Sequence, residues 1–238
     1  MWTITQSPLG RIAIPSSVPN GFAVFCTTRD FEGRINDAIA RQISNAIEEQ
    51  FGIASSLATC SQVHGATVQR AKSEGTWREC DSCDALWSDD PGVALAIKIA
   101  DCLPVAMIDA SNRVAANVHS GWRGAVQGIT AAAVDTVTTS TAFDPASALA
   151  YLGPSIRVCC FEVGEEVAER FDARYVDRRH SKPHVDLPAF TRDVLLQRGF
   201  AADRIDDSEL CTRCDGSVFH SYRREGAGGG RNLQIVTT

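Results

Sequence analysis

The sequence lacks any long apolar run. Although 44% of its 238 residues are hydrophobic, no stretch approaches the roughly 18 apolar residues that would indicate a transmembrane helix. The opening residues also lack a basic segment followed by an apolar one, which is the pattern of a secretory signal peptide. We therefore expect a cytoplasmic protein that does not associate with membranes.

Positive charge is scarce as well. The chain has 23 Lys and Arg residues against 29 Asp and Glu residues, and its formal net charge is −6. A protein that binds nucleic acid or an anionic membrane normally presents a basic surface. The acidic balance argues against both kinds of partner, although a few local arginines could still bind a small anion.

Several common catalytic motifs are absent. The chain contains no P-loop, no GxGxxG after a predicted strand and no GxSxG. The glycine-rich stretch at 226–231 is not followed by Lys–Ser or Lys–Thr, so we expect a turn there. The sequence therefore gives no indication of a nucleotide-binding loop or of a serine hydrolase.

Cysteine, by contrast, is plentiful, at nine residues. The odd number and the missing secretion signal make a disulfide framework a poor interpretation, so some cysteines should be buried and others metal ligands or reactive thiols. Two CxxC pairs occur, Cys80 with Cys83 and Cys211 with Cys214. They lie much farther apart than the about 15–20 residues of a zinc ribbon, so they either meet in space as a structural zinc site or remain free thiols.

Predicted strands and helices alternate along the whole chain, which favours one mixed α/β domain over residues 1–238. A run of apolar residues at helical spacing ends at Gly52, and Asp186 can cap a helix that ends before Gly199. The other expected elements are strands at 21–28, 93–99, 104–109, 113–119 and 151–154, helices at 125–137 and 163–171, and a loop-rich stretch at 72–92.

Three potential metal ligands stand at the ends of predicted strands. His64 lies in SQVHG, Cys102 in ADCLP, and His119 directly before SGWRG. Such side chains converge on one rim of a sheet, and two imidazoles with one thiolate suit Zn²⁺, which keeps a fourth position for water or substrate. Two other interpretations use the same residues: hydrogen-bonded histidines beside a buried cysteine, or a nucleophilic Cys102 with His119 or His64 as its base.

Arginines in turns form a second candidate group. Arg123 lies between the glycines of GWRG, while Arg29 and Arg223 lie in TTRDFEGR and SYRR. A guanidinium matches the oxygens of phosphate or carboxylate, and flanking glycines let backbone amides approach the same anion at a helix start. We therefore favour anion binding by Arg123, whereas Arg224 is expected to be a solvated surface residue.

Five blocks of the sequence, in order, resemble the YfiH/YlmD family. They are SQVHG, DALWSDDPGVALAIKIADCLPV, VAANVHSGWRGAVQGI, YLGPSIRVCCFEVGEEV and CTRCDGSVFHSYRREGAGGGR. The resemblance extends from about Gly21 to the C-terminus, and the combination of ADC-x-P with H-x-GWRG is specific. The family was long labelled laccase-domain or multicopper polyphenol oxidase, and is now described as zinc-dependent purine nucleoside phosphorylases with adenosine deaminase activity.

The resemblance implies an enzyme with two reactions. One is phosphorolysis of adenosine, inosine, guanosine and methylthioadenosine to the base and ribose 1-phosphate, and the other is hydrolytic deamination of adenosine. Purine nucleosides and phosphate are thus the expected partners, and the chain is expected to be a monomer or a homodimer. Five histidines are too few for several copper centres, so Zn²⁺ is the expected cofactor, with Cu²⁺ as the alternative.

The resemblance also implies roles for individual residues. The expected metal ligands are His64, Cys102 and His119. The expected catalytic residues are Cys102, His119, Arg123 and Asp101, the last of which would orient a ligand or transfer a proton. The expected substrate-binding residues are Arg29, Ser155 and Arg223.

The implied fold is an α/β sandwich related to the catalytic domain of cytotoxic necrotizing factor toxins. Those toxins are cysteine hydrolases, so the Cys–His interpretation stays open. A second role proposed for some bacterial members is that of an amidase that edits peptidoglycan precursors, with either zinc or the thiolate acting on the amide. The segment after TTR is shorter here than in the family, and His220 stands where the family usually has phenylalanine.

Overall fold

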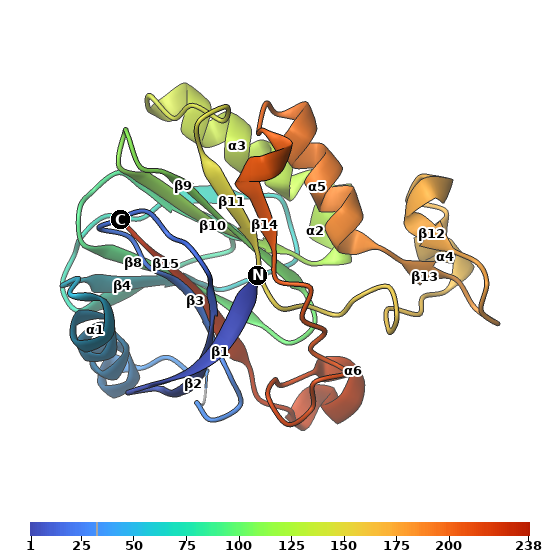
Figure 1. The fold of residues 1–238 in the computed structure, drawn as a ribbon, viewed down its shortest axis with the longest axis horizontal. Coiled ribbons are helices and arrows are strands. Elements are labelled where there is room, and N and C mark those ends of the chain that lie inside the picture. Colours follow the sequence, from blue (N-terminus) through green and yellow to red (C-terminus); the bar gives the residue numbers. More distant parts are fainter. Residues whose placement is uncertain (32) are drawn as a thin grey trace.

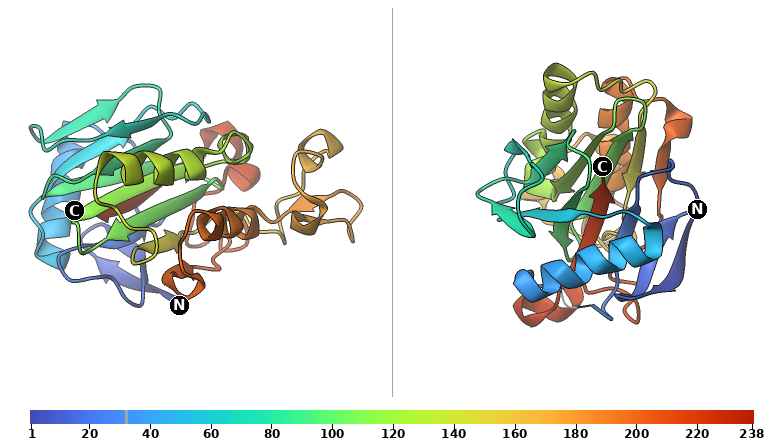
Figure 2. Two further views of the ribbon diagram at one scale, coloured as in Figure 1. Left: turned by 90° about the horizontal axis from the view of Figure 1, so that it is seen from above. Right: turned by 90° about the vertical axis from the view of Figure 1, so that its left-hand side faces the viewer.

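Two β-sheets face each other in the computed structural model, which describes residues 1–31 and 33–238. Helix α1 (Asp37–Phe51) covers the outer face of one sheet, and helices α3 (Ile129–Ser140) and α5 (Leu187–Gln197) cover the outer face of the other (Figure 1, Figure 2). The four layers form an α/β sandwich, which confirms the predicted mixed α/β architecture.

The first sheet has seven strands and joins segments from the whole length of the chain. Its order is β1 (Trp2–Ser7), β2 (Gly10–Pro15), β3 (Val24–Thr27), β15 (Asn232–Thr237), β8 (Val93–Ile99), β4 (Ser56–Cys60) and β6 (Trp77–Cys80). Strand β4 runs parallel to both β8 and β6, and the other neighbours are antiparallel.

The second sheet has six strands and carries most of the chain's central segment. Its order is β14 (Ile205–Asp207), β11 (Leu149–Leu152), β9 (Leu103–Asp109), β10 (Val114–Ser120), β7 (Ala85–Ser88) and β5 (Val68–Arg70). The outer pairs β11–β14 and β5–β7 are parallel, whereas the central strands are antiparallel.

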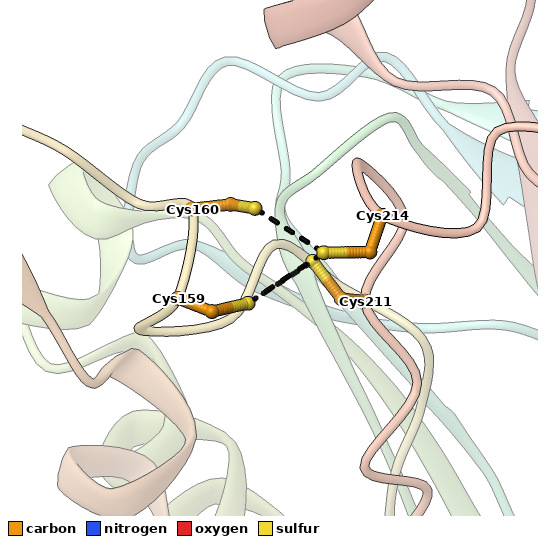
Figure 3. A group of neighbouring side chains, drawn as sticks. All are labelled: Cys159, Cys160, Cys211 and Cys214. Carbon is orange, nitrogen blue, oxygen red and sulfur yellow. Dashed lines mark hydrogen bonds between the residues drawn. The ribbon is translucent and has the colours of Figure 1, made fainter.

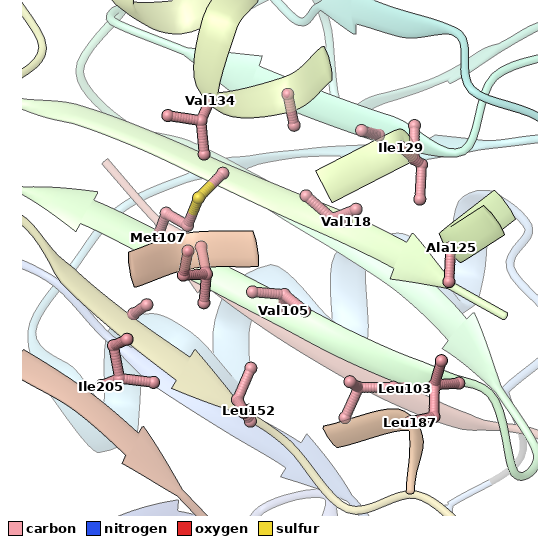
Figure 4. Packing of buried hydrophobic residues seen from close by; sticks show 14 of the residues in the cluster. Leu103, Val105, Met107, Val118, Ala125, Ile129, Val134, Leu152, Leu187 and Ile205 are labelled. Carbon is pink, nitrogen blue, oxygen red and sulfur yellow. The ribbon is translucent and has the colours of Figure 1, made fainter. Parts of the chain in front are cut away.

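The central strands are buried on both faces, which explains their nearly continuous apolar sequence. Successive side chains of a strand point to opposite faces. In β9, Leu103, Val105 and Met107 therefore pack toward the helices, as Figure 4 shows, while Ala106 and Ile108 pack between the two sheets. This double burial fixes the ends of β8, β9 and β10, where the candidate ligands lie.

Helix α1 ends, and helix α5 begins and ends, as the sequence predicts. The side chain of Asn36 accepts hydrogen bonds from the first backbone amides of α1, and Gly52 ends that helix with a positive φ of 70°. Asp186 caps α5 by accepting from the amide of Ala189, and Gly199 follows its end with a φ of 95°. Local chemistry was thus sufficient to locate the end of α1 and both ends of α5, whereas the cap at Asn36 is seen only in the structure.

Other expectations were wrong in detail. The helix expected at 125–137 is divided into α2 (Trp122–Val126) and α3, because Gly128 between them adopts a left-handed φ of 83°. The helix expected at 163–171 is only the single turn α4 (Glu165–Ala168). The loop-rich stretch 72–92 also contains two strands that were not predicted, β6 and β7. Strand β7 is too short and too fully buried to show an alternating pattern.

A small extension projects from the sandwich (Figure 1, Figure 2). It contains α4, the short helix at Ala173–Tyr175 and the two-stranded sheet of β12 (Val176–Asp177) and β13 (His184–Val185). Further short helices lie at Ala202–Arg204, at Tyr222–Glu225 (α6) and at Gly226–Gly228. Among the described residues, no helix combines the length and apolar character needed to cross a bilayer.

Candidate metal centre

Three side chains from distant segments converge beside the ends of the central strands. His64 lies in the loop after β4, Cys102 in the turn between β8 and β9, and His119 near the end of β10. Their nitrogen and sulfur atoms all lie within 4.8 Å of one another. The three ligands that the sequence predicts are thus brought together, in an arrangement that could hold a metal ion.

The site is closed on one side and open on the other. His119 is buried, Cys102 is half-buried and His64 is exposed. The Cys102 Sγ lies 3.9 Å from His64 Nε2, and the two imidazole rings meet edge to face with their centroids 4.8 Å apart. Solvent or substrate can therefore approach from the His64 side.

Asp84 organises the site, and sequence reasoning missed it. Its fully buried carboxylate accepts a hydrogen bond from His119 Nδ1 at 2.8 Å, and also accepts from the backbone amides of His64 at 2.9 Å and Gly65 at 2.7 Å. With Nδ1 held as the donor, His119 presents Nε2 to the candidate metal position. The only available signal was an acidic residue directly before the apolar segment ALWS.

The glycines of GWRG allow close approach. A Cβ on Gly121 would lie 2.9 Å from Cys102 Sγ and 3.2 Å from His64 Cδ2, and a Cβ on Gly124 would lie 2.9 Å from the carbonyl oxygen of Gly65. Gly121 itself has a φ of −66°, which any residue can adopt. Glycine at this position is therefore explained by the space beside the ligands and not by the backbone conformation.

The local charges favour ligation by the thiolate. Burial alone would raise the pKa of Cys102, but the nearby His119 and His64 lower the pKa of its thiol to about 6. Burial would likewise lower the pKa of His119, but Cys102 and Asp84 raise it to about 9. The neighbouring imidazoles therefore favour the thiolate form of Cys102, which is the form that ligates a metal ion.

The three ligands open into a pocket of about 760 Å³. Its walls combine aromatic and cationic side chains, namely Trp122, Phe161, Tyr222, Lys98, Arg123, Arg223 and Arg231. The Arg123 guanidinium lies 4.4 Å from the centroid of the Trp122 ring. No described residue accepts a hydrogen bond from that guanidinium, so its donors remain available to a ligand. A molecule with a planar base and an anionic group would suit these walls.

Asp101 lines this pocket, but its carboxylate is occupied. One oxygen accepts from Thr212 Oγ1 at 2.6 Å, and the other accepts from Ser221 Oγ at 3.0 Å and from the backbone amide of Arg223 at 2.7 Å. These bonds tie the turn before Cys102 to the start of α6. In this geometry Asp101 positions Arg223, whose guanidinium donates to the carbonyl oxygen of Glu162.

The other two predicted substrate-binding residues, Arg29 and Ser155, do not line this pocket. Arg29 lines a second pocket, of about 580 Å³, together with His220; its guanidinium donates to the carbonyl oxygen of Gly216 and pairs with Glu225 at 3.5 Å. Ser155 is buried, and its Oγ has no partner among the described residues. Arg231 lines both pockets and marks where they adjoin.

The sandwich and its three converging ligands define a mixed α/β protein with a candidate metal site in an open pocket. Residues 32–238 match the family model described as multi-copper polyphenol oxidoreductase laccase, and the chain belongs to this family.

Curated relatives carry the names of nucleoside enzymes. The chain is 30% identical over 192 residues to purine nucleoside phosphorylase YlmD of Geobacillus stearothermophilus, covering 74% of this chain and 70% of the relative. It is 34% identical over 172 residues to purine nucleoside phosphorylase YfiH of Shigella flexneri, covering 69% and 67%. It is 35% identical over 161 residues to adenosine deaminase RL5 of an unknown prokaryotic organism. That match covers 64% of this chain and only 61% of the relative.

Solved structures share the fold over nearly the whole chain. YlmD from Geobacillus stearothermophilus superimposes with a TM-score of 0.83 at 24% identity, covering 95% of each chain. The hypothetical protein YfiH from Bacillus licheniformis superimposes with a TM-score of 0.84 at 21% identity, covering 98% of this chain and 97% of the other. The resemblance to the YfiH/YlmD family is thereby confirmed, and the chain has that family's single mixed α/β fold.

Proposed function

We propose that this protein is a zinc-dependent purine nucleoside phosphorylase that also deaminates adenosine. The observation that carries the proposal is the position of His64, Cys102 and His119 at the base of a pocket whose walls offer Trp122 and Arg123. The names of the relatives point to the same two reactions. The proposed substrates are adenosine, inosine, guanosine and methylthioadenosine, with phosphate as the second substrate of phosphorolysis.

The donor set fits Zn²⁺. Two imidazoles and one thiolate, with one open side, match a catalytic zinc site with three protein ligands, and the carboxylate of Asp84 on His119 is the kind of support that such ligands receive. Within the described residues, two groups of side chains are close enough to hold a metal ion, and only this one contains histidine. A single mixed His–Cys site favours Zn²⁺ over a set of copper centres. Zn²⁺ held there would supply a Lewis acid to an oxygen of substrate or water.

For phosphorolysis, the chain's own residues would hold phosphate and base. The guanidinium of Arg123, which donates to no described residue, offers two parallel donors to phosphate oxygens, and Trp122 or Phe161 offers a flat surface to the purine. A phosphate oxygen then forms a bond to the anomeric carbon of ribose while the bond to the purine nitrogen breaks, and that nitrogen takes up a proton. Asp101 would contribute by holding the start of α6, and with it Arg223, against the pocket.

For deamination, water adds at the carbon that bears the amino group of adenosine, and ammonia leaves. The same pocket would bind the nucleoside, but no phosphate is needed. Arg29 and Ser155 would stabilise the segments beside the pocket and would not contact a nucleoside bound at the metal site. We further propose that residues 1–238 act as one functional unit in the cytoplasm, as a monomer or homodimer without nucleic-acid or membrane partners.

The test is to incubate the zinc-loaded protein with each nucleoside, with and without phosphate. Base release that requires phosphate, together with inosine formation from adenosine that does not, is the expected result. If no purine nucleoside is consumed under either condition, the proposed function is wrong.

One arrangement favours a second candidate, an amidase acting on peptidoglycan precursors. Cys102 lies beside His64, and His119 is oriented by Asp84, which resembles a nucleophile with a base and its orienting carboxylate. An amidase of this kind would cleave a muramyl–amino acid amide. Cleavage that persists in a strong chelator and is lost in Cys102→Ala would favour the thiolate form of this candidate.

A further inference from the structure

A second group of four cysteines lies outside the site described above. Cys159 and Cys160 belong to the loop that follows β11, and Cys211 and Cys214 to the loop between β14 and α6. Figure 3 shows their sulfur atoms turned toward one another, and all four lie within 4.8 Å of one another. The pair Cys211 and Cys214 thus meets Cys159 and Cys160, and not the CxxC pair at Cys80 and Cys83 that the sequence offered as its partner.

The separations between the sulfur atoms suit a tetrahedral cation site. Cys159 Sγ lies 3.8 Å from both Cys211 Sγ and Cys214 Sγ, and Cys160 Sγ lies 3.4 Å from Cys214 Sγ. Zinc–sulfur bonds of about 2.3 Å in a regular tetrahedron place the sulfur atoms roughly 3.8 Å apart. A disulfide requires only about 2.05 Å, and all four cysteines are free in this structure.

The surroundings of the cluster fit a structural site. Cys160 and Cys211 are buried, while Cys159 and Cys214 close the cluster toward solvent. Four protein thiolates would fill a tetrahedral coordination sphere and leave no position for substrate. Arg213 donates a hydrogen bond to Cys160 Sγ at 3.5 Å, so a cationic side chain already faces the sulfur atoms.

We propose that Cys159, Cys160, Cys211 and Cys214 bind one Zn²⁺ ion as a structural site, separate from the site at His64, Cys102 and His119. The donor set is entirely thiolate, which selects zinc or iron over magnesium or calcium, and its closed tetrahedral form is typical of structural zinc. This assignment stands on the cluster's own geometry and does not depend on which reaction the neighbouring pocket performs.

Zinc at this position would fix one wall of the pocket. The loop that carries Cys159 and Cys160 also carries Phe161, and the loop that carries Cys211 and Cys214 leads into Arg223; both Phe161 and Arg223 line the pocket. The other bonds between these segments do not form a strand ladder. The amide of Ser155 donates to the carbonyl oxygen of Leu210 at 3.2 Å, and the amide of Thr212 donates to that of Ser155 at 3.0 Å. The Arg157 guanidinium also donates to the Asp207 carboxylate at 2.6 and 2.8 Å, and that of Arg223 donates to the carbonyl oxygen of Glu162 at 2.9 Å. A cation bound by all four cysteines would therefore hold Phe161 and Arg223 at fixed positions relative to each other.

The decisive experiment measures metal content per chain by mass spectrometry, on protein purified under reducing conditions. The wild-type chain is expected to hold two zinc ions. Cys214→Ser should keep only the ion of the pocket site, and Cys102→Ala should keep only the ion of the four-cysteine site. The double variant should hold none. A cobalt-substituted Cys102→Ala protein should also show the intense sulfur-to-metal absorption of a four-thiolate site.

Two further variants serve as controls. Cys80→Ala removes a cysteine of the same CxxC pattern outside the cluster, and it should keep both ions. Cys214→His replaces an exposed ligand by another that zinc accepts, so it should regain the ion that Cys214→Ser loses. Recovery in Cys214→His separates loss of a ligand from general misfolding.

Three results would overturn the proposal. One is a wild-type chain with a single zinc ion that Cys102→Ala removes completely. Another is iron in place of zinc at the cysteine cluster. The third is a disulfide among these four cysteines in the non-reduced wild-type chain, detected as the mass of the lost hydrogens and mapped to these residues, when the same chain binds no second metal ion after reduction.

Discussion

The two groups of potential ligands are built from different parts of the fold and have different chemistry. His64, Cys102 and His119 stand at the ends of doubly buried strands, beside the buried carboxylate of Asp84, and open into a pocket. The four cysteines come from two surface loops, with Arg213 as their charged neighbour. A site with mixed ligands, held by a rigid sheet and open on one side, is typical of a catalytic metal ion. Four thiolates that close around one ion are typical of a structural metal ion, which here would join two loops.

The comparison implies that the two sites respond differently to substitution. The sheet ends are held by backbone pairing and core packing, so loss of a ligand there should remove function and leave the fold intact. The two loops are joined by separate hydrogen bonds and one ion pair and not by a continuous ladder of backbone bonds, so loss of a ligand there should reduce stability. The predictions below test this contrast, from the largest expected effect to the smallest.

Cys102→Ala should abolish activity, because it removes one of three ligands and the only thiolate of the pocket site. The loss should exceed the about 10–100-fold that changing a residue beside a metal ligand produces. Circular dichroism and the temperature of unfolding should stay close to wild type, since Cys102 lies in a turn between strands. Full turnover by this variant would show that the pocket chemistry does not use the proposed metal.

Asp84→Asn should reduce metal affinity of the pocket site by about 10–100-fold. The amide keeps the shape of the carboxylate, but it loses the charge that supports His119 and cannot accept from all the amides that Asp84 holds. Competition with a chelator measures the change, and Asp81→Asn, at an exposed position three residues earlier, is the matched control. Equal affinities in the two variants would contradict the role assigned to Asp84.

Cys214→Ser should lower the temperature of unfolding while the pocket zinc remains. If loss of the second ion costs about 2 kcal/mol, the shift for a chain of this size is about 4–8 °C. Because Cys214 is exposed, loss of the thiol by itself should have little effect. Calorimetry in the reduced state measures the shift, and a change of less than about 1 °C would remove the contrast between the two sites.

Arg123→Lys should have the smallest and most selective effect. A lysine keeps the charge but loses the planar pair of donors, so phosphorolysis should fall about tenfold, as expected for one charge-assisted hydrogen bond of about 1.5 kcal/mol. Deamination of adenosine needs no phosphate and should stay near wild type. Steady-state rates for both reactions measure the ratio, and an equal loss in both would instead indicate that Arg123 supports the pocket through Trp122.

The sequence predicted features that depend on nearby residues. The cap at Asp186 and the glycines at Gly52 and Gly199 act within a few residues, so the end of α1 and both ends of α5 could be predicted directly. Features without a local signal were missed. Strand β7 is buried on both faces and shows no alternation, and the break at Gly128 depends on a single residue with positive φ.

The sequence by itself determined the α/β class, the segments that form β3, β8, β9, β10 and β11, and the residue types that could bind a metal. Only the tertiary structure decided which of them meet. Asp84 bonds to His119 across 35 positions, and Cys159 meets Cys211 across 52. The physical reason is that a ligand cluster depends on distance between side chains, and for residues so far apart in the chain that distance is set by sheet pairing and packing, which no local pattern records.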